Sequence, residues 1–201
     1  MPDYTLESFI PDCENQAAAH GEPADIVRAI TPLMHHLLCG SRDFLKPEHF
    51  QSEPDHYARN LVYAAEGAGL SLYALVWLPG QWTPVHDHGT WGVVGVIEGQ
   101  LEEQNYMRAD PDQSPERHAG IELRRGGLVL LSPGSVSTFV PNPDHIHKTG
   151  CAADLPRCVS LHLYGRAMNS FFSYDVAAGT RTLVEAAHNE TRLGQSGAAA
   201  A

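Results

Sequence analysis

Two histidines separated by one residue, His86 and His88, form the first arrangement in the sequence that could do chemistry. Successive side chains of a β-strand point to opposite faces, so residues i and i+2 share a face. On a strand, both imidazoles therefore point the same way, close enough to bind one metal ion, while Asp87 points the other way. With 12 histidines in 201 residues, such a pair can arise by chance, and His145 and His147 form a second one.

A second arrangement alternates polar side chains with leucines at Ser160, His162 and Tyr164. On a strand, the hydroxyl, the imidazole and the phenol share one face, an order that suits a proton relay. The alternative is a half-exposed strand whose polar face meets water.

A third arrangement is the pair Tyr57 and Arg59, which also share a face if they lie on a strand. A guanidinium binds a carboxylate through two parallel hydrogen bonds, and a tyrosine hydroxyl can add a third. The alternative is an arginine on an edge strand that makes a surface ion pair.

The strands that must position these side chains are predicted between about residues 57 and 184. Short runs rich in Val, Leu, Tyr and Thr are interrupted there by Gly, Pro and Asp, and no long helix intervenes, which favours an antiparallel barrel or sandwich. The predicted strands are 70–78, 84–88, 92–97, 101–106, 127–131, 136–140 and 158–164. A turn at Glu98–Gly99 predicts a hairpin, and residues 110–120 are expected to form a polar surface loop.

The N-terminal quarter predicts helices, because apolar residues recur at helical spacing near 6–17 and 26–38. Pro11 predicts a kink or a late start in the first helix. Pro32 predicts that the second helix restarts there, and Gly40 suits its C-cap. We expect one domain over residues 1–185, with helices in 1–50, a β-barrel in 57–184, and a flexible tail at 186–201.

The composition excludes several kinds of partner. The chain has 13 Lys and Arg against 24 Asp and Glu, a net charge of −11, which argues against binding to nucleic acid or to an anionic membrane surface. Its apolar runs are too short to span a bilayer. The four cysteines form no CxxC pair and the N-terminal residues lack a signal pattern, so a cytoplasmic protein with reduced thiols is expected.

The first histidine pair lies in a pattern that resembles a known one. Gly80, the pair itself and Gly99 are similar to the first cupin motif, and Pro133-Gly134 followed by a later histidine is similar to the second. This resemblance implies a small antiparallel double-stranded β-helix, a jelly-roll barrel, with a metal ion inside. A cupin that has lost its metal is the alternative.

One departure from the cupin motif has a chemical meaning. The motif usually carries a glutamate four or five residues after the second histidine, where this chain has Gly92 and Val93. Two histidines and a carboxylate offset part of the charge of iron(II), whereas three histidines leave the full 2+ on the ion. A three-histidine site therefore favours an anionic ligand such as a thiolate.

Taken together, the motifs resemble the cysteine dioxygenase family of thiol dioxygenases in order and spacing from about residue 45 to 165. The resemblance implies a cupin barrel that holds iron(II), and a reaction in which a small thiol and both atoms of O2 become a sulfinic acid. It implies three iron ligands, His86, His88 and His147, and no ligand role for His145. It also implies five groups around the substrate: Arg59 and Tyr57 on its carboxylate, and Tyr164 near the thiol and O2, oriented by His162 and Ser160.

Substrate choice within the family follows the residue at position 59. Members with Arg there resemble cysteine dioxygenases, and members with Gln prefer 3-mercaptopropionate, so Arg59 predicts L-cysteine. The segment around Trp91-Gly92 is more similar to the bacterial mercaptopropionate group. Gly92 stands where mammalian members have a cysteine that is cross-linked to the active-site tyrosine, so no such cross-link is expected. Mercaptosuccinate would need a second cation, for which Arg166 is the candidate.

Two interpretations from other classes stay open. One is a cupin sensor or binding module that holds a metal without turnover, and the other is a zinc or nickel isomerase of the cupin class. The first has no need of the alternating Ser160–Tyr164 face, and the second expects the carboxylate ligand that this chain lacks.

Overall fold

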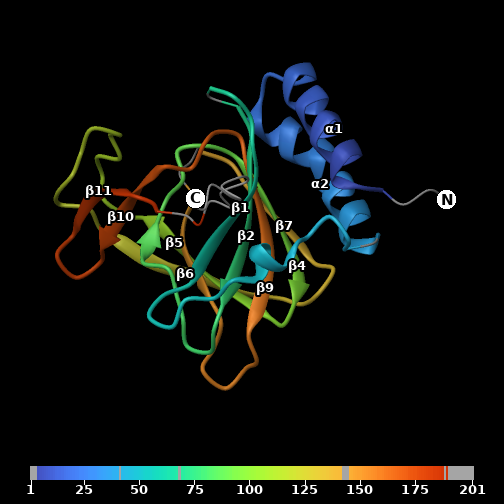
Figure 1. The fold of residues 1–201 in the computed structure, drawn as a ribbon. Coiled ribbons are helices and arrows are strands. Elements are labelled where there is room, and N and C mark those ends of the chain that lie inside the picture. The colour runs from blue at the N-terminus through green and yellow to red at the C-terminus, as the bar shows by residue number, and fades with distance from the viewer. Residues whose placement is uncertain (1–3, 41, 68, 142–144, 188, 190–201) are drawn as a thin grey trace, which may run out of the picture.

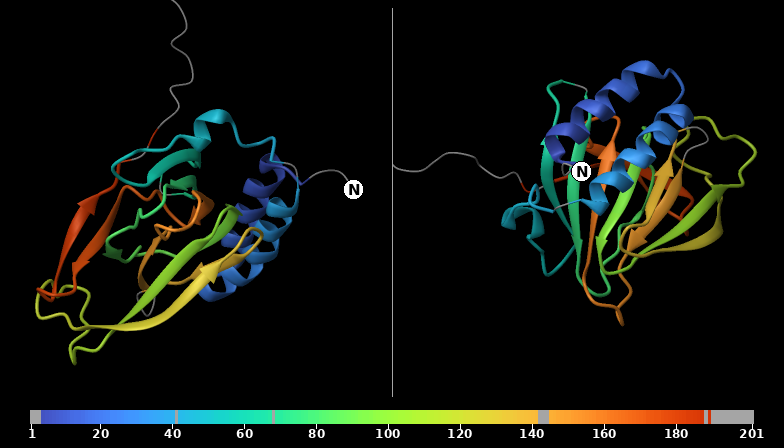
Figure 2. Two further views of the ribbon diagram at one scale, coloured as in Figure 1. Left: turned by 90° about the horizontal axis from the view of Figure 1, so that it is seen from below. Right: turned by 90° about the vertical axis from the view of Figure 1, so that its right-hand side faces the viewer.

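Two antiparallel β-sheets face each other, and two helices cover the outer face of one of them (Figures 1 and 2). The structure is a computed structural model that describes residues 4–40, 42–67, 69–141, 145–187 and 189 of the chain. This arrangement confirms the expected all-β core of double-stranded β-helix type with a small N-terminal helical layer.

The five-stranded sheet has the order β1-β2-β9-β4-β7, with antiparallel neighbours throughout. Its strands are β1 (Ala58–Ala64), β2 (Ser71–Trp77), β4 (Gly92–Glu98), β7 (Val136–Phe139) and β9 (Cys158–Tyr164). Strands β2 and β9 are buried at every residue. Burial on both faces explains why their sequences are apolar with few interruptions.

The six-stranded sheet has the order β11-β10-β3-β8-β5-β6. Its strands are β3 (Val85–His86), β5 (Leu101–Arg108), β6 (Leu123–Leu131), β8 (Ile146–Gly150), β10 (Ser170–Asp175) and β11 (Thr180–Glu185). Each of the seven predicted strands overlaps an observed one. The sequence prediction names no separate strand at β1, β8, β10 or β11, although it considers Tyr57 and Arg59 on a strand.

The helices are α1 (Leu6–Ala19), α2 (Pro23–Cys39) and a short 3-10 helix, η1 (Pro47–Phe50). The prediction that the second helix restarts at Pro32 is wrong, because α2 begins at Pro23 and continues through Pro32. A proline inside a helix leaves the carbonyl four residues earlier without a donor. That carbonyl belongs to Arg28, and both residues are exposed, so water can take the hydrogen bond. Gly40 is the C-cap, as expected.

None of the helices in the described ranges has the length and hydropathy that a membrane crossing requires.

The helical layer packs on the five-stranded sheet through α2, which contacts β4 and β7. A Cβ atom on Gly95 of β4 would lie 3.0 Å or less from side-chain atoms of Met34 and Leu38. A glycine at this position therefore lets the helix approach the sheet closely. One apolar cluster fills this helix–sheet layer, and a second fills the space between the two sheets.

The Glu98–Gly99 turn does not form the predicted hairpin. It joins β4 of the five-stranded sheet to β5 of the six-stranded sheet, so the strands on its two sides have different partners. A register shift between Val96 and Glu98 marks the end of β4, and such bulges bend a strand out of its sheet.

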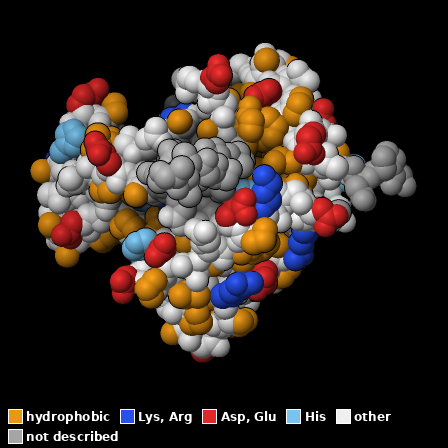
Figure 3. Space-filling model, viewed as in Figure 1, with side chains coloured by type: hydrophobic (Ala, Val, Ile, Leu, Met, Phe, Trp, Pro, Cys, Tyr) orange, Lys and Arg blue, Asp and Glu red, His pale blue; other side chains and the backbone are white. Residues whose placement is uncertain are grey.

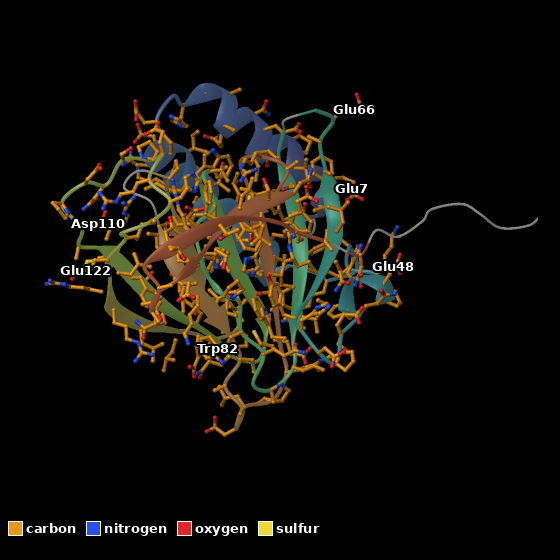
Figure 4. The ribbon with its side chains drawn as sticks, turned by 90° about the vertical axis from the view of Figure 1, so that its left-hand side faces the viewer. Glu7, Glu48, Glu66, Trp82, Asp110 and Glu122 are labelled. Atoms are coloured by element: carbon orange, nitrogen blue, oxygen red, sulfur yellow. The ribbon has the colours of Figure 1, made fainter. Side chains whose placement is uncertain are left out.

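The polar loop predicted at 110–120 does connect two strands, β5 and β6. Figure 4 shows Asp110 and Glu122 beside each other at the end of this strand pair, where a carboxylate oxygen of Asp110 accepts a hydrogen bond from the backbone of Glu122. Of the predicted tail, Asn189 pairs with β1 through two backbone hydrogen bonds, and most of 186–201 lies outside the described residues.

Candidate metal centre

Strand pairing brings three histidines together. His86 on β3 and His147 on β8 are direct partners across the two strands, and His88 follows two residues after His86. The three ring centroids form a nearly equilateral triangle with sides of 4.7, 4.8 and 4.8 Å. Nitrogen atoms of all three rings lie within 4.8 Å of one another.

The contacts behind His86 and His147 leave a nitrogen lone pair of each ring directed at the centre of the triangle, whereas Nδ1 of His88 has no hydrogen-bond partner among the described residues. Nδ1 of His86 donates to the carbonyl oxygen of Pro84 at 3.0 Å, and Nδ1 of His147 lies 3.4 Å from a carboxylate oxygen of Glu103. A neutral imidazole with a proton on Nδ1 has its lone pair on Nε2. The Nε2 atoms of His88 and His147 face each other at 3.3 Å, which is favourable only with a cation or a proton between them. The three-imidazole donor set therefore fits a divalent transition-metal ion.

Burial keeps all three histidines in the form that binds metal. It lowers the pKa of His86 and His88 well below the ordinary value, and repulsion from the neighbouring imidazoles lowers these pKa values further. The pKa of His147 is also lowered by burial, although Glu103 opposes the change. At neutral pH the rings are uncharged and each has a free nitrogen lone pair, as metal ligands must.

Strand β9 carries a continuous row of hydrogen bonds. The hydroxyl of Ser160 lies 2.8 Å from Nε2 of His162, and the hydroxyl of Tyr164 lies 3.4 Å from Nδ1 of the same ring. Nε1 of Trp77 donates to Ser160 at 3.0 Å. All four side chains are buried, so the alternative of a polar face in water is wrong.

The protonation of this row is fixed by its burial. Burial lowers the pKa of His162 to about 3, and the nearby His147 and Arg59 act in the same direction. Burial also raises the pKa of Tyr164. At neutral pH the imidazole is uncharged and the phenol keeps its proton.

Arg59 on β1 is a buried cation that is only 8% exposed. Its Nη atoms donate to the carbonyl oxygens of Met168 at 2.9 Å and Ala187 at 3.3 Å, and its guanidinium lies over the ring of Tyr73. Among the described residues, no carboxylate forms an ion pair with it. Such a cation is suited to receive an anion from outside the protein.

Seven of the eight predicted site residues line one cavity of about 20 Å³, which is space on the scale of one water molecule. The seven are Tyr57, Arg59, His86, His88, His147, His162 and Tyr164. Ser160 lies behind His162. The described residues that line the cavity include no carboxylate, and Arg59 is the one cation among them.

Gly92 stands directly opposite Tyr164 in the pairing of β4 with β9. A Cβ atom at position 92 would lie 2.2 Å from Cζ of Phe139, whose ring stacks on His88. The phenyl ring therefore fills the space that a side chain at position 92 would need.

Sequence reasoning missed several residues that hold the site together. Asp87 points away from the metal centre, as predicted, and accepts hydrogen bonds from the hydroxyl of Tyr174 at 2.8 Å and the backbone N–H of Phe172 at 3.2 Å. Arg166, the candidate second cation, donates instead to the carbonyl oxygens of His88 and Ser170. Neither its sequence context nor its charge predicts this backbone contact.

Residues 46–177, more than half of the chain, match the family described as cysteine dioxygenase type I. The chain belongs to this family. The matched range contains every residue of the candidate site and excludes both long helices.

Solved structures with a similar arrangement include other cupins. A double-stranded β-helix protein from Klebsiella pneumoniae subsp. pneumoniae MGH 78578 is 16% identical, with 73% of this chain and 99% of that chain covered at a TM-score of 0.45. A cupin-like protein from Thermotoga maritima MSB8 is 18% identical, with 67% and 84% covered at a TM-score of 0.37. An RmlC-like cupin from Ralstonia eutropha JMP134 is 13% identical, with 65% and 68% covered at a TM-score of 0.43.

Family membership assigns the protein to the cupin metal enzymes with dioxygenase chemistry. The buried group of three histidines provides a place for the metal.

Proposed function

We propose that the protein is an iron(II) thiol dioxygenase that converts a small thiol carboxylic acid, L-cysteine above all, and O2 into the sulfinic acid. One observation carries the proposal: one cavity joins three neutral imidazoles, a tyrosine hydroxyl and a guanidinium that has no ion pair with any described carboxylate. In the reaction R–SH + O2 → R–SO2H, sulfur loses four electrons and O2 gains them. The reaction therefore needs no external reductant.

The three imidazoles of His86, His88 and His147 would hold the iron. When bound there, iron(II) supplies a cation that lowers the pKa of the thiol and a centre that reacts with O2. The uncharged ligand set supports this role, because no ligand charge competes with a thiolate. Phe139, stacked on His88, keeps water from one side of the site.

Arg59 is assigned the substrate carboxylate. The protein has a net charge of −11, and acidic side chains are spread over the face shown in Figure 3, so an anionic thiol acid is attracted only by a local positive site. Within the described part of the chain, the hydrogen bonds of the guanidinium go to neutral carbonyl oxygens, and a carboxylate is a stronger acceptor for its N–H groups. Tyr57, whose ring stacks on Trp77, forms the wall beside it.

A second carboxylate on the substrate finds no second cation among the described residues that line the cavity. Arg166 is absent from the cavity lining, and its guanidinium is held by backbone carbonyl oxygens. This observation favours cysteine or 3-mercaptopropionate over mercaptosuccinate.

Tyr164 is assigned the role of hydrogen-bond donor to the reacting thiol and oxygen atoms. Its raised pKa keeps the proton on the hydroxyl, and the neutral ring of His162 fixes the direction in which that hydroxyl points. Ser160 and Trp77 hold the far side of the imidazole. A binding module without turnover needs no such row of buried hydrogen bonds.

The isomerase alternative is weakened by the absence of a carboxylate from the described lining of the cavity. All four cysteines are free thiols, which suits the proposed cytoplasmic location.

The test is oxygen consumption with protein purified without a metal-affinity tag and loaded with iron(II). L-Cysteine, 3-mercaptopropionate and mercaptosuccinate are compared side by side, and the sulfinate product is identified by mass spectrometry. We expect the highest kcat/KM with L-cysteine and the lowest with mercaptosuccinate. A clear preference for another thiol would overturn the cysteine assignment, and no uptake with any of the three would overturn the class.

A further inference from the structure

Glu103 is a buried carboxylate that touches a proposed metal ligand from behind. It lies on β5, which pairs with the strand of His147, and it is only 4% exposed. Its Oε1 atom lies 3.4 Å from Nδ1 of His147 and 3.1 Å from Nε2 of His145. Glu103 does not line the cavity, so it stands on the side of the imidazole away from the substrate.

The chemistry of these three groups fixes where the protons lie. Nε2 of His145 and Nδ1 of His147 both face one carboxylate oxygen of Glu103, and they lie 3.1 Å from each other. A carboxylate only accepts hydrogen bonds, so Nδ1 of His147 faces Glu103 favourably with a proton on it. His147 then carries its proton on Nδ1, and its Nε2 lone pair points at His88 and the metal centre.

We infer that Glu103 is the positioning residue of the metal centre, which orients His147 and supplies the negative charge that other cupins place on the metal itself. The inference rests on the proposed function only for the identity of the metal as iron. The common cupin motif has a glutamate ligand where this chain has Gly92 or Val93. Here a glutamate lies one imidazole further out, so the ligand set stays neutral while the buried ion still has a counter-charge.

Carboxylates placed in this way increase the basicity of a histidine ligand and fix the orientation of its ring, and their loss typically weakens metal binding by about 10- to 100-fold. His145 takes the outer place in the group. Its side chain is 23% exposed, and its N–H holds the same oxygen of Glu103 from the solvent side. It therefore supports Glu103 and is not a ligand.

Glu103, His145 and His147 also form a group that could hold an ion of its own. Such an ion would bind Nδ1 of His147, the atom that carries the proton when Nε2 binds the central metal. One neutral imidazole cannot serve both ions. A second bound ion per chain would thus contradict the positioning role.

The test measures metal affinity, independently of thiol oxidation. Glu103→Gln keeps the size of the side chain and removes its charge, and Glu102→Gln on the same strand is the matched control. Cobalt(II) affinity is measured by competition with a chelator, and the absorption spectrum of cobalt is recorded at saturation. Apo-protein melting checks the fold of each variant.

We expect cobalt binding to be about 10- to 100-fold weaker in Glu103→Gln, with a shifted cobalt spectrum, and unchanged in Glu102→Gln. His145→Gln should weaken binding less than Glu103→Gln. Equal affinity and an identical spectrum in Glu103→Gln and wild type would overturn the inference, and so would two cobalt ions per wild-type chain. Weaker cobalt binding in Glu103→Gln together with no thiol oxidation by the wild type would support the inference and refute the proposed function.

Discussion

The two sheets position their parts of the site in different ways. The five-stranded sheet carries the Ser160–Tyr164 row on β9, which is paired on both sides with β2 and β4, and Arg59 on β1, a seven-residue edge strand paired with β2. The six-stranded sheet carries His86 on β3, which has only two residues. A full ladder of backbone hydrogen bonds fixes β9, whereas β3 is too short to be fixed in this way.

Around β3, hydrogen bonds from side chains take the place of the backbone ladder that so short a strand lacks. Asp87 binds the hydroxyl of Tyr174 and the backbone N–H of Phe172, both on the neighbouring strand β10. Arg166 binds the carbonyl oxygen of His88 through two of its nitrogens. The metal half of the site thus depends on buried polar contacts, whose loss costs more than the loss of one backbone hydrogen bond in a long strand.

The largest expected effect is a difference in metal content between variants changed on the six-stranded sheet and a variant changed on the five-stranded sheet. Changing His86, His88 or His147 to Ala should each remove most of the metal from protein purified without a tag, because two imidazoles hold an ion far less tightly than three. Tyr164→Phe, on the other sheet, should keep the metal and lower turnover by about 100-fold or more, the usual scale for a positioned proton donor. Metal analysis and oxygen consumption on the same samples provide the comparison.

Two results would contradict this division. If His145→Ala loses the metal while His147→Ala keeps it, the third ligand is His145. If Tyr164→Phe turns over at the wild-type rate, the buried row on β9 serves stability alone.

A smaller effect is expected from the cation of the five-stranded sheet. Arg59→Ala should leave the metal in place. Its kcat/KM for L-cysteine should fall by an amount that corresponds to about 2–5 kcal/mol of lost transition-state stabilisation, the scale for breaking a buried charge-assisted pair. Arg157→Ala is the control, because Arg157 makes an exposed ion pair with Glu98 at the far end of β9. A kcat/KM for Arg59→Ala equal to that of the control would show that the carboxylate binds elsewhere.

Strand periodicity made the faces of the site predictable. Two-residue spacing places His86 and His88 on one common face, and Ser160, His162 and Tyr164 on another. The structure brings the members of each set together. This information is local, because it depends only on the pleat of one strand. The family resemblance added His147, which spacing alone could not choose over His145.

The missed features depend on pairing between distant strands. Glu102 and Glu103 are adjacent, and only the register of β5 against β8 decides which carboxylate faces His147. The Glu98–Gly99 turn has the same local sequence whether its strands pair or enter different sheets. Pro32 has a local cost that the packing of α2 on β4 and β7 outweighs.

The smallest expected effect is the contribution of His162, on the five-stranded sheet, to the pH dependence of stability. In the unfolded chain His162 takes up a proton as the pH falls through its ordinary pKa of 6.5, whereas the folded protein resists protonation down to a pKa of about 3. The unfolding free energy therefore decreases as the pH is lowered below 6.5. Between pH 7 and pH 5 this one residue accounts for about 2 kcal/mol.

Melting of the metal-free protein at pH 7 and pH 5 tests the contribution of His162 to this loss of stability. In wild type the drop in Tm includes His162 and the buried ligand histidines, whose pKa values are lowered in the same direction. His162→Gln keeps a hydrogen-bonding side chain between Ser160 and Tyr164 and has no proton to gain. Its drop in Tm should be smaller than that of wild type by about 4–8 °C. An equal drop in the two proteins would mean that the acid sensitivity resides entirely in the metal half of the site.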